Sequence, residues 1–403
     1  MAQTLKFGSG TWATKKGSTL AYSDEGGNFK PLPFTYTGAG KGTRVNKEGL
    51  IEVVENDRPR IDYLDSEDGV FLLEKAATNL VTYSEDFTEW NLSSSGNGQT
   101  PILTSNYTTN LGLNASRIIF NRTSKSTSNI SSIRGNDYTQ STNTFSIYIK
   151  SNTRNVNIDF RLGSSIVTYE VTNEWKRMEF SGSDFYRSYF GLLGSSSDLY
   201  ADLSIVAAQA EVGNVASSYI PTQGSIQTRV AETASGSGNS GVFNSQEGVL
   251  FLDTKALSND GTTRTIGLSD GSNSNRIHFI NYAVSNGYSV NYRVSNSTQV
   301  AFTEVGNVLD YQKIAFKYKS GDFSLWYNGF EIDTDDNTTM MAENTLDRLS
   351  FNQEPNSLNY YGKTKEISYY NEVLTDLELE TLTSYRTWEE MVKELNLNII
   401  HNE

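Results

Sequence analysis

The feature of this sequence that most constrains its fold is a series of short stretches in which apolar and polar residues alternate. In residues 143–151, NTFSIYIKS, alternation places Phe145, Ile147 and Ile149 on one side of an extended chain. Similar stretches follow at roughly ten-residue spacing, with turn residues between them. This pattern is typical of an antiparallel sandwich in which one face of each strand lies in the core.

A second series of such stretches runs from residue 242 to about residue 370. It contains FSLWYNGFEIDT, in which Asn328-Gly329 indicates the tip of a hairpin because both residues tolerate positive φ. Only six prolines occur among abundant Asn, Ser, Thr, Gly and Tyr, a composition that suits many short strands joined by polar turns. The sequence therefore predicts an all-β protein with two β-sandwich (jelly-roll) domains.

Changes in residue pattern and composition along the chain give the expected domain boundaries. Residues 1–82 show little regular amphipathic pattern and are interpreted as an irregular N-terminal anchoring segment. The remaining expected parts are a jelly roll at 83–232, a flexible linker at 233–241 (TASGSGNSG), a second sandwich at 242–386 and a C-terminal helix at 387–403.

Both ends of the chain carry apolar side chains that we expect to serve as an anchor or oligomer interface. Near the C-terminus, Thr375 and Glu378 form a capping box that starts a short helix, and a second helical stretch follows with an apolar stripe. The interface candidates are Phe7, Trp12, Phe29, Phe34, Trp388, Met391 and Leu395.

Composition excludes several classes of function. The chain has no cysteine and two histidines, so a disulfide framework, a thiolate nucleophile and the usual zinc ligand sets are excluded. A net charge of −14 disfavours nucleic acid, membrane surfaces and polyanions as partners. The first twenty residues lack the apolar centre of a secretory signal. We expect a soluble protein made in a reducing compartment, with no cofactor.

Several phrases occur here in the order found in a module of tailed-bacteriophage virion proteins. They are LLEKAATNLVTYSEDFTEWN (72–91), TFSIYIKS, EWKRMEFS and AQAEVGNVASSYIPTQGSIQTR, and the resemblance covers most of 42–230. That module resembles carbohydrate-binding jelly rolls. The second sandwich resembles a concanavalin A-like or laminin-G-like domain, through FSLWYNGFEIDT and KTKEISYYNEVLTDLELETLT. The chain's two ends resemble those of fibre-type proteins of crAss-like and marine phages.

The resemblance implies a non-enzymatic fibre or spike protein of the virion, assembled in the cytoplasm of a bacterial host. Expected partners are other virion proteins of the capsid or tail, further copies of the chain as a homotrimer, and bacterial surface polysaccharide. Two alternatives stay open: a capsid decoration or head-fibre protein without a ligand, and a polysaccharide depolymerase.

The depolymerase alternative depends on EIDTDD, in which alternation places Glu331, Asp333 and Asp335 on one sheet face. Retaining glycosidases need two carboxyl groups about 5–5.5 Å apart, but an exposed acidic strand explains the same residues. Weak candidates for calcium are Asp260 and Asp270, in turns that Asn/Asp-Gly chemistry also explains.

Exposed aromatic rings could stack on sugars, and Trp90, Tyr360 and Tyr361 are the candidates for glycan binding. His278, in RIHFINY, has no metal-binding companion in its strand and is interpreted as structural.

Overall fold

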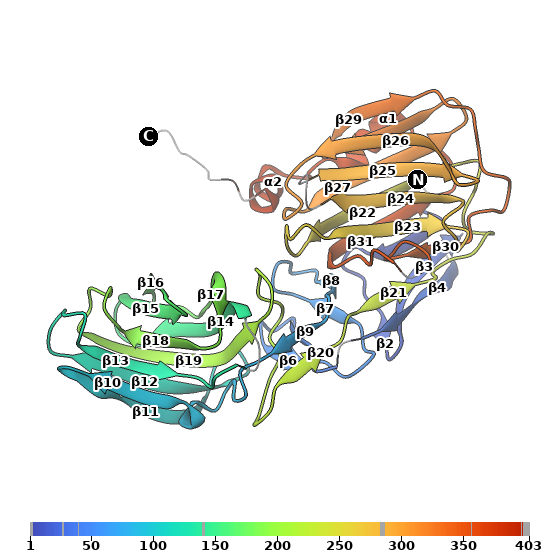
Figure 1. The fold of residues 1–403 in the computed structure, drawn as a ribbon. Coiled ribbons are helices and arrows are strands. Elements are labelled where there is room, and N and C mark those ends of the chain that lie inside the picture. The colour runs from blue at the N-terminus through green and yellow to red at the C-terminus, as the bar shows by residue number, and fades with distance from the viewer. Residues whose placement is uncertain are drawn as a thin grey trace. The chain divides into compact units, whose positions relative to one another are not determined.

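The computed structural model describes residues 3–25, 28–38, 40–138, 142–282, 287–355, 357–395 and 397. The chain is all-β, as predicted, and is built from antiparallel sheets with two short helices near the C-terminus (Figure 1). It divides into two compact units. Unit 1 comprises Met1–Ala39, Asn56–Lys75 and Ala231–Glu403, and unit 2 comprises Gly40–Glu55 and Ala76–Val230.

Unit 1 is a sandwich of a twelve-stranded and a five-stranded sheet in the described residues. The larger sheet contains β1 (Leu5–Gly8), β2 (Thr14–Lys15), β3 (Ser18–Glu25), β4 (Asn28–Thr37), β7 (Arg60–Asp62), β8 (Val70–Leu73), β21 (Thr233–Ser235), β22 (Glu247–Ala256), β27 (Gln312–Lys319), β28 (Phe323–Tyr327), β29 (Phe330–Asp335) and β31 (Gly362–Tyr370). The smaller sheet has the order β26 (Ser297–Val305), β25 (Gly287–Val294), β24 (Arg276–Tyr282), β23 (Thr263–Ser269) and β30 (Arg348–Ser350).

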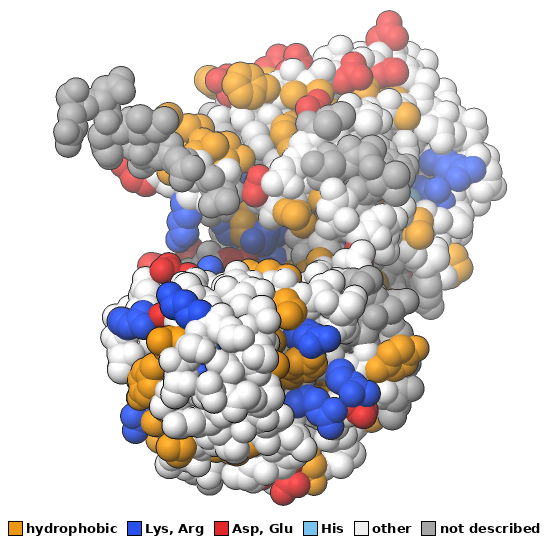
Figure 2. Space-filling view, turned by 60° about the vertical axis from the view of Figure 1, so that its left-hand side comes forward, with side chains coloured by type: hydrophobic (Ala, Val, Ile, Leu, Met, Phe, Trp, Pro, Cys, Tyr) orange, Lys and Arg blue, Asp and Glu red, His pale blue; other side chains and the backbone are white. Residues whose placement is uncertain are grey.

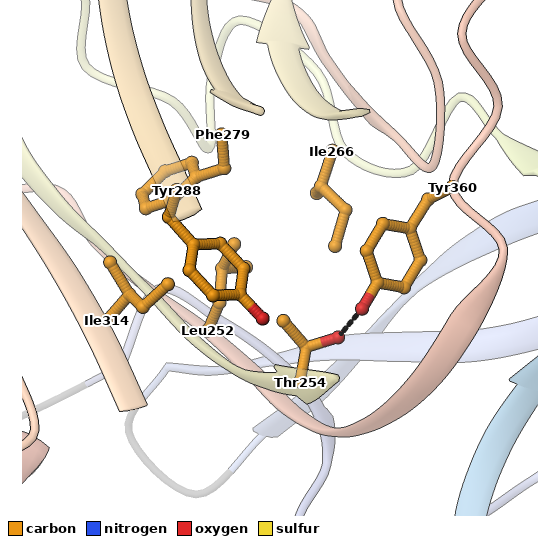
Figure 3. A pocket seen from close by; sticks show the side chains of 7 residues that line it. All are labelled: Leu252, Thr254, Ile266, Phe279, Tyr288, Ile314 and Tyr360. Carbon is orange, nitrogen blue, oxygen red and sulfur yellow. Dashed lines mark hydrogen bonds between the residues drawn. The ribbon is translucent and has the colours of Figure 1, made fainter. Parts of the chain in front are cut away.

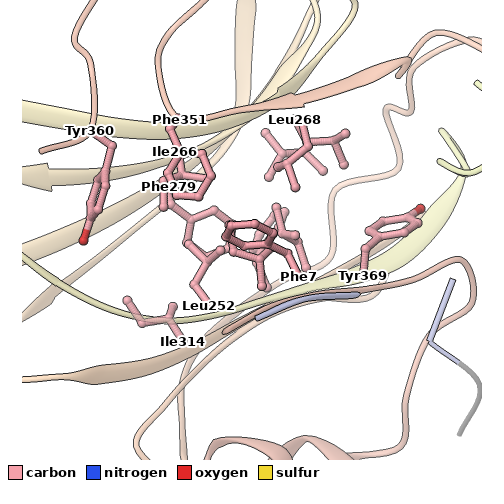
Figure 4. Close-up of a cluster of buried hydrophobic side chains, with 14 of the residues drawn as sticks. Phe7, Leu252, Ile266, Leu268, Phe279, Ile314, Phe351, Tyr360 and Tyr369 are labelled. Atoms are coloured by element: carbon pink, nitrogen blue, oxygen red, sulfur yellow. The ribbon is translucent and has the colours of Figure 1, made fainter. Parts of the chain in front are cut away.

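The N-terminal strand lies inside the larger sheet of unit 1. Strand β1 pairs with β3 on one side and along its whole length with β31 on the other. Phe7 is fully buried, and its ring contacts those of Trp12, Phe34, Phe71 and Phe351 with centroids 5.0–5.8 Å apart. Figure 4 shows Phe7 among the side chains of the two facing sheets, so it belongs to the central core of this unit.

Residues 1–82 therefore differ from the irregular anchoring segment that the sequence suggested. The described part of this segment contains strands β1–β9, which belong in part to unit 1 and in part to unit 2. Local pattern did not reveal these strands because most are short and because their partners lie far along the chain; Leu5, for example, is paired with Tyr369.

Residues 233–241 also differ from expectation, because they are packed into unit 1 and do not form a free linker. Strand β21 pairs with β4, and the Ser237 hydroxyl donates to the Leu32 carbonyl at 2.7 Å. Gly238 has a φ of +88°, and a Cβ there would lie 2.3 Å from the ring of Phe243. The small residues thus allow close packing, which composition alone cannot distinguish from flexibility.

A buried ion network joins three separate segments within unit 1. The guanidinium of Arg60 is fully buried; its Nε donates to Glu232 at 2.7 Å, and it forms an ion pair with Glu74 at 2.7 Å. The hydroxyl of Tyr36 also donates to Glu232. Because both acids satisfy one guanidinium, these residues fix the register in which β4, β7 and β21 meet.

The C-terminal helices belong to unit 1. Helix α1 (Asp376–Thr383) begins at the predicted capping box of Thr375 and Glu378, which is confirmed. Helix α2 (Trp388–Glu394) is held by an ion pair of 2.7 Å between Glu390 and Lys313 of β27.

Unit 2 is a sandwich of two five-stranded sheets in its described residues. One has the order β10 (Asn91–Ser95), β13 (Ile130–Arg134), β18 (Ser188–Leu192), β15 (Val156–Leu162) and β16 (Ser165–Val171), and is called sheet E. The other contains β11 (Gly98–Thr108), β12 (Asn114–Arg122), β19 (Tyr200–Glu211), β14 (Thr142–Ser151) and β17 (Lys176–Phe185), and is called sheet F. Further elements are β5 (Thr43–Val45), β6 (Ile51–Val53), β9 (Ala77–Asn79), β20 (Gln227–Arg229) and the 3₁₀ turn η1 (Phe87–Glu89).

The alternation that predicted the sandwich is confirmed in unit 2. In β14, Phe145, Ile147 and Ile149 lie in the core, at most 1% exposed. The predicted hairpin of unit 1 is also confirmed, since Asn328 and Gly329 have φ values of 48° and 92° between β28 and β29.

Two buried charges hold the loop 193–198 of unit 2. The Asp159 carboxylate accepts backbone N–H groups of this loop, including those of Leu193 and Ser196 at 3.2 and 2.8 Å. The Arg122 guanidinium donates to carbonyl oxygens of the loop, including those of Ser196 at 2.5 Å and Asp198 at 3.1 Å. The loop's backbone groups are thus satisfied by one acid and one base from opposite sheets.

Candidate functional site

Two of the three aromatic residues predicted to bind glycans are buried. Trp90 is 5% exposed; its indole N–H donates to the Tyr83 carbonyl at 2.8 Å and its ring packs on Phe87. Tyr360 is 2% exposed and lies between the sheets of unit 1. Neither ring can stack on a sugar in this structure. Tyr361 is half-buried and hydrogen-bonded by Asn359.

Tyr360 lines a small cavity between the two sheets of unit 1, and Figure 3 shows it facing Thr254, to which it is hydrogen-bonded. The cavity measures about 10 Å³, room for a single water. Its walls are Leu252, Thr254, Ile266, Phe279, Tyr288, Ile314 and Tyr360. It is too small for a sugar ring.

The carboxylates of the depolymerase alternative lie on β29, an edge strand of the larger sheet. Glu331 and Asp333 are exposed, and Asp335 is half-buried and accepts from the Asn337 backbone at 2.7 Å. This exposure differs from the enclosed carboxylate pair of a glycosidase.

The two weak calcium candidates are held by protein groups. Asp260 accepts from Lys75 at 2.9 Å and from Arg264 at 2.6 Å. Although burial alone would raise the pKa of Asp260, these two cations keep it well below its usual range. Asp270 accepts from Ser272 and Asn275 in its own turn. Within the described residues, no three His, Asp or Glu side chains are grouped as metal ligands.

The predicted interface residues differ in exposure. Phe7 and Phe34 are in the core, so they cannot form an interface, and Trp12 packs against that core. Phe29 and Trp388 are 68% and 61% exposed. Met391 and Leu395 are half-buried.

A different set of residues forms a candidate binding surface on the outer face of sheet E. In β13, β18 and β15, Ile133, Phe190 and Phe160 point into the core, so their neighbours in sequence point outward. The register pairs Tyr189 with Arg134 on one side and with Arg161 on the other. These three outward side chains form one cross-strand row, here called the ledge.

The ledge combines a fixed aromatic ring with positive charge. The Arg161 guanidinium lies over the Tyr189 ring, 5.3 Å from its centroid, and all three ledge residues are half-exposed. Asp137 forms ion pairs of 3.9 Å with Arg134 and 3.2 Å with Arg187. One carboxylate is therefore shared by Arg134 of the ledge and by Arg187.

The row next to the ledge carries small or buried groups. Gly191 has a φ of +150°, and a Cβ there would lie 2.2 Å from the Ser131 carbonyl oxygen, so a side chain is excluded. Its cross-strand neighbours are Ser132 and Asp159, both buried. Loop 193–198 covers Asp159 in this row, so the ledge is bordered on this side by the backbone of that loop.

Charge is distributed unevenly between the units. Unit 2 carries 14 Lys and Arg against 15 Asp and Glu, whereas unit 1 carries 19 against 32. Within unit 2, Asp159 and Asp198 are engaged by internal partners, as is Asp202, which pairs with Arg117 at 2.5 Å. Figure 2 shows blue side chains beside orange ones over this unit.

Sequence reasoning missed the ledge because the register of sheet E decides it. Tyr189 and Arg161 are separated by 28 positions, and nothing local pairs them. The available signal was alternation: in NVNIDFRL the apolar residues that predict a core-facing strand also predict that Arg161 points outward.

No match to a family model or to a curated protein is found for this chain. Among solved structures, it is similar to the CBM40 of a Ruminococcus gnavus IT-sialidase (16% identity, 37% of this chain, 94% of that chain, TM-score 0.32). It is also similar to domain 4 of AbnA, a GH43 arabinanase from Geobacillus stearothermophilus (13% identity, 38% of this chain, 73% of that chain, TM-score 0.32). A third similar structure is a pentraxin from Limulus polyphemus (15% identity, 35% of this chain, 71% of that chain, TM-score 0.29). At TM-scores below 0.5, these similarities assign neither a function nor a site to this chain.

In the part of the chain that the structure describes, neither helix is long and apolar enough to cross a membrane.

Proposed function

We propose that this chain is a non-enzymatic glycan-binding protein and that the ledge of unit 2 contacts the sugar. The observation that carries the proposal is the row formed by Arg134, Tyr189 and Arg161. Tyrosine offers a large contact area that loses little conformational entropy on binding, and arginine is, like tyrosine, enriched among the residues that carry most binding energy. Because Arg161 already lies over Tyr189, both side chains are held in position before a ligand arrives.

The sequence phrases shared with phage virion proteins support a place for this protein in a fibre or spike, where it binds bacterial surface polysaccharide. Such fibres act as oligomers because linked copies raise the effective concentration of a weak site. A homotrimer is proposed on the same resemblance, and the exposed rings of Phe29 and Trp388 are available for contacts between copies.

The proposal is tested by binding of the full-length protein to an array of bacterial polysaccharides and to host cells. Tyr189→Ala and Arg161→Ala should each weaken binding about tenfold, the loss of roughly one good contact. Tyr200→Ala is the matched control, since Tyr200 is an exposed tyrosine on sheet F of the same unit. Normal binding by both ledge variants would refute the role of the ledge.

The two alternatives give different results in the same experiments. A decoration protein would be found in purified particles and would bind no glycan on the array. A depolymerase would release soluble oligosaccharides from host polysaccharide, and that release would be lost in Glu331→Gln or Asp333→Asn. Electron microscopy of particles, with antibody labelling, would locate the protein on the head or the tail.

A further inference from the structure

A second polar surface lies on the outer face of the smaller sheet of unit 1. In β24 and β25, Ile277, Phe279 and Tyr292 point into the core, so Arg276 and Arg293 point outward. The register pairs these two arginines directly across the strands. Like charges directly opposite each other destabilise a sheet, so this pairing needs a physical explanation.

Neither arginine forms an ion pair with an acid among the described residues. Arg276 donates to the Asn273 carbonyl at 2.8 Å, and Arg293 donates to the Asn296 carbonyl at 2.5 Å. The Nε atoms of both are buried and have no hydrogen-bond partner in the described part of the chain. This is unexpected in a unit with 32 acidic and 19 basic residues.

Three acids that adjoin β23 and β30 in the sequence have partners of their own. Asp347 pairs with Arg348 at 2.7 Å, Asp270 accepts from Asn275 at 2.8 Å, and Glu354 accepts from Ser350 at 2.8 Å. Figure 2 shows blue side chains on unit 1 that stand apart from the red ones. In the described part of unit 1, the arginine pair therefore forms no ion pair with these acids.

A buried imidazole adjoins the pair. His278 lies two residues from Arg276 on the same face, opposite Gly267 and Asn291, and is 1% exposed. Its ring packs over Gly267, where a Cβ would come within 2.8 Å of the imidazole Cδ2. Both ring nitrogens lack a hydrogen-bond partner among the described residues.

The imidazole is neutral at physiological pH. Burial, together with the positive charges of Arg276 and Arg293, lowers the pKa of His278 to about 3. A neutral imidazole offers one N–H donor and one acceptor nitrogen. Two half-exposed guanidinium groups thus lie side by side on this face, and the buried imidazole next to them adds no charge of its own.

We propose that Arg276 and Arg293 form a subsite for the anionic group of an acidic saccharide, a carboxylate or a sulfate ester. A guanidinium presents donors in a fixed fork that matches such oxyanions. The anion would provide the ion-pair partner that the two arginines lack among the described residues, whereas His278, at 1% exposed, stays buried. This subsite lies in unit 1 and does not depend on the ledge of unit 2.

The test uses the full-length protein and three probes: D-glucuronate, glucose 6-sulfate and neutral glucose. Binding is followed by calorimetry and by the NMR signals of the arginine Nε–H groups. We expect one or both acidic sugars to bind and to shift the signals of Arg276 and Arg293. Binding of glucuronate would identify a carboxylate as the anion, and binding of glucose 6-sulfate would identify a sulfate ester. Glucose should not shift them. Equal shifts with all three probes, or no shift with any, would overturn the proposal.

Arg276→Gln and Arg293→Gln should each reduce affinity for the acidic sugar at least about tenfold, as expected for loss of a charge-assisted contact. Arg348→Gln is the matched control, since Arg348 is in the same cross-strand row but is paired with Asp347; its affinity should stay within about twofold of wild type. An equal loss in Arg348→Gln would contradict the proposed site.

Thermal unfolding separates binding from folding. Removing one of two opposed like charges should leave the unfolding temperature of Arg276→Gln unchanged or higher. A lower unfolding temperature together with unchanged affinity would show that the arginines stabilise the sheet and do not bind an anion.

Discussion

The position of Phe7 gives a sharp test of whether the N-terminal strand is part of the folded core of unit 1. Phe7 is fully buried and its ring contacts four other aromatic rings. Truncation of a buried Phe to Ala costs about 3–5 kcal/mol of folding free energy, and well-oriented ring pairs add to the cost of burial alone. We therefore expect Phe7→Ala to lose about 4–5 kcal/mol, the upper part of that range.

A loss of this size is a large share of the stability of a domain, which is about 5–15 kcal/mol. Guanidinium denaturation can be followed by the hydrogen exchange of separate peptides, which reports the unfolding of each unit on its own. Peptides from β31 should lose protection at a denaturant concentration lower by about 1 M, whereas peptides from β14 of unit 2 should keep theirs.

Phe29→Ala is the matched control, because Phe29 belongs to the same N-terminal segment but is 68% exposed. Its effect should be within about 0.5 kcal/mol. A loss below about 1 kcal/mol in Phe7→Ala, where a core truncation should cost several times more, would refute the core assignment. Equal losses in the two variants would do the same.

Other predictions concern charged groups. The pKa of His278 is about 3 in the folded protein and about 6.5 when unfolded, so stability should fall as pH decreases from about 6.5 toward 3, by at most about 1.4 kcal/mol per pH unit. Between pH 7 and pH 5, the free energy of unfolding in urea should therefore decrease by about 2 kcal/mol more in the wild type than in His278→Gln. Equal decreases in the two proteins would contradict this. Glu232→Gln leaves the buried Arg60 short of its main partner and should destabilise unit 1 by about 3–5 kcal/mol in thermal unfolding, and a change under about 1 kcal/mol would count against the network. Glu331→Gln and Asp333→Asn alter exposed side chains, so binding to the polysaccharide array should be unchanged; reduced binding in either would show that this edge strand contributes to it.

The sequence predicted those elements that are decided locally. The alternation around Ile147 defines a core face, the Asn328-Gly329 pair favours a tight hairpin, and Thr375 begins a capped helix. Each of these depends on a few neighbouring residues, so a single sequence is sufficient.

The sequence did not predict how the chain is divided between the two units. The segment from residue 1 to 82 contributes to both, and β21 pairs with a strand almost two hundred positions earlier. Register between such distant segments is decided by tertiary packing, which has no local signature. For the same reason the burial of Trp90 and Tyr360 could not be read from their immediate neighbours.

The arginine pair of unit 1 was partly accessible to prediction. In RIHFINYAVSNGYSVNYRV, alternation indicates both strands, but Arg276 comes opposite Arg293 only in the register in which β24 and β25 pair. What the sequence could not supply was the absence of a nearby acid, because Asp270, Asp347 and Glu354 are engaged only in the folded unit.

The way in which Arg122 holds loop 193–198 has a consequence for the conditions under which unit 2 stays folded. Carbonyl oxygens from four residues converge on Arg122, an arrangement that elsewhere can enclose a metal ion. Here the positive charge is covalently part of the chain and cannot dissociate. Calcium depletion, by a chelator or by a calcium-poor habitat, would therefore leave this loop in place, because the side chain of Arg122 fills the position that a bound metal ion would otherwise occupy.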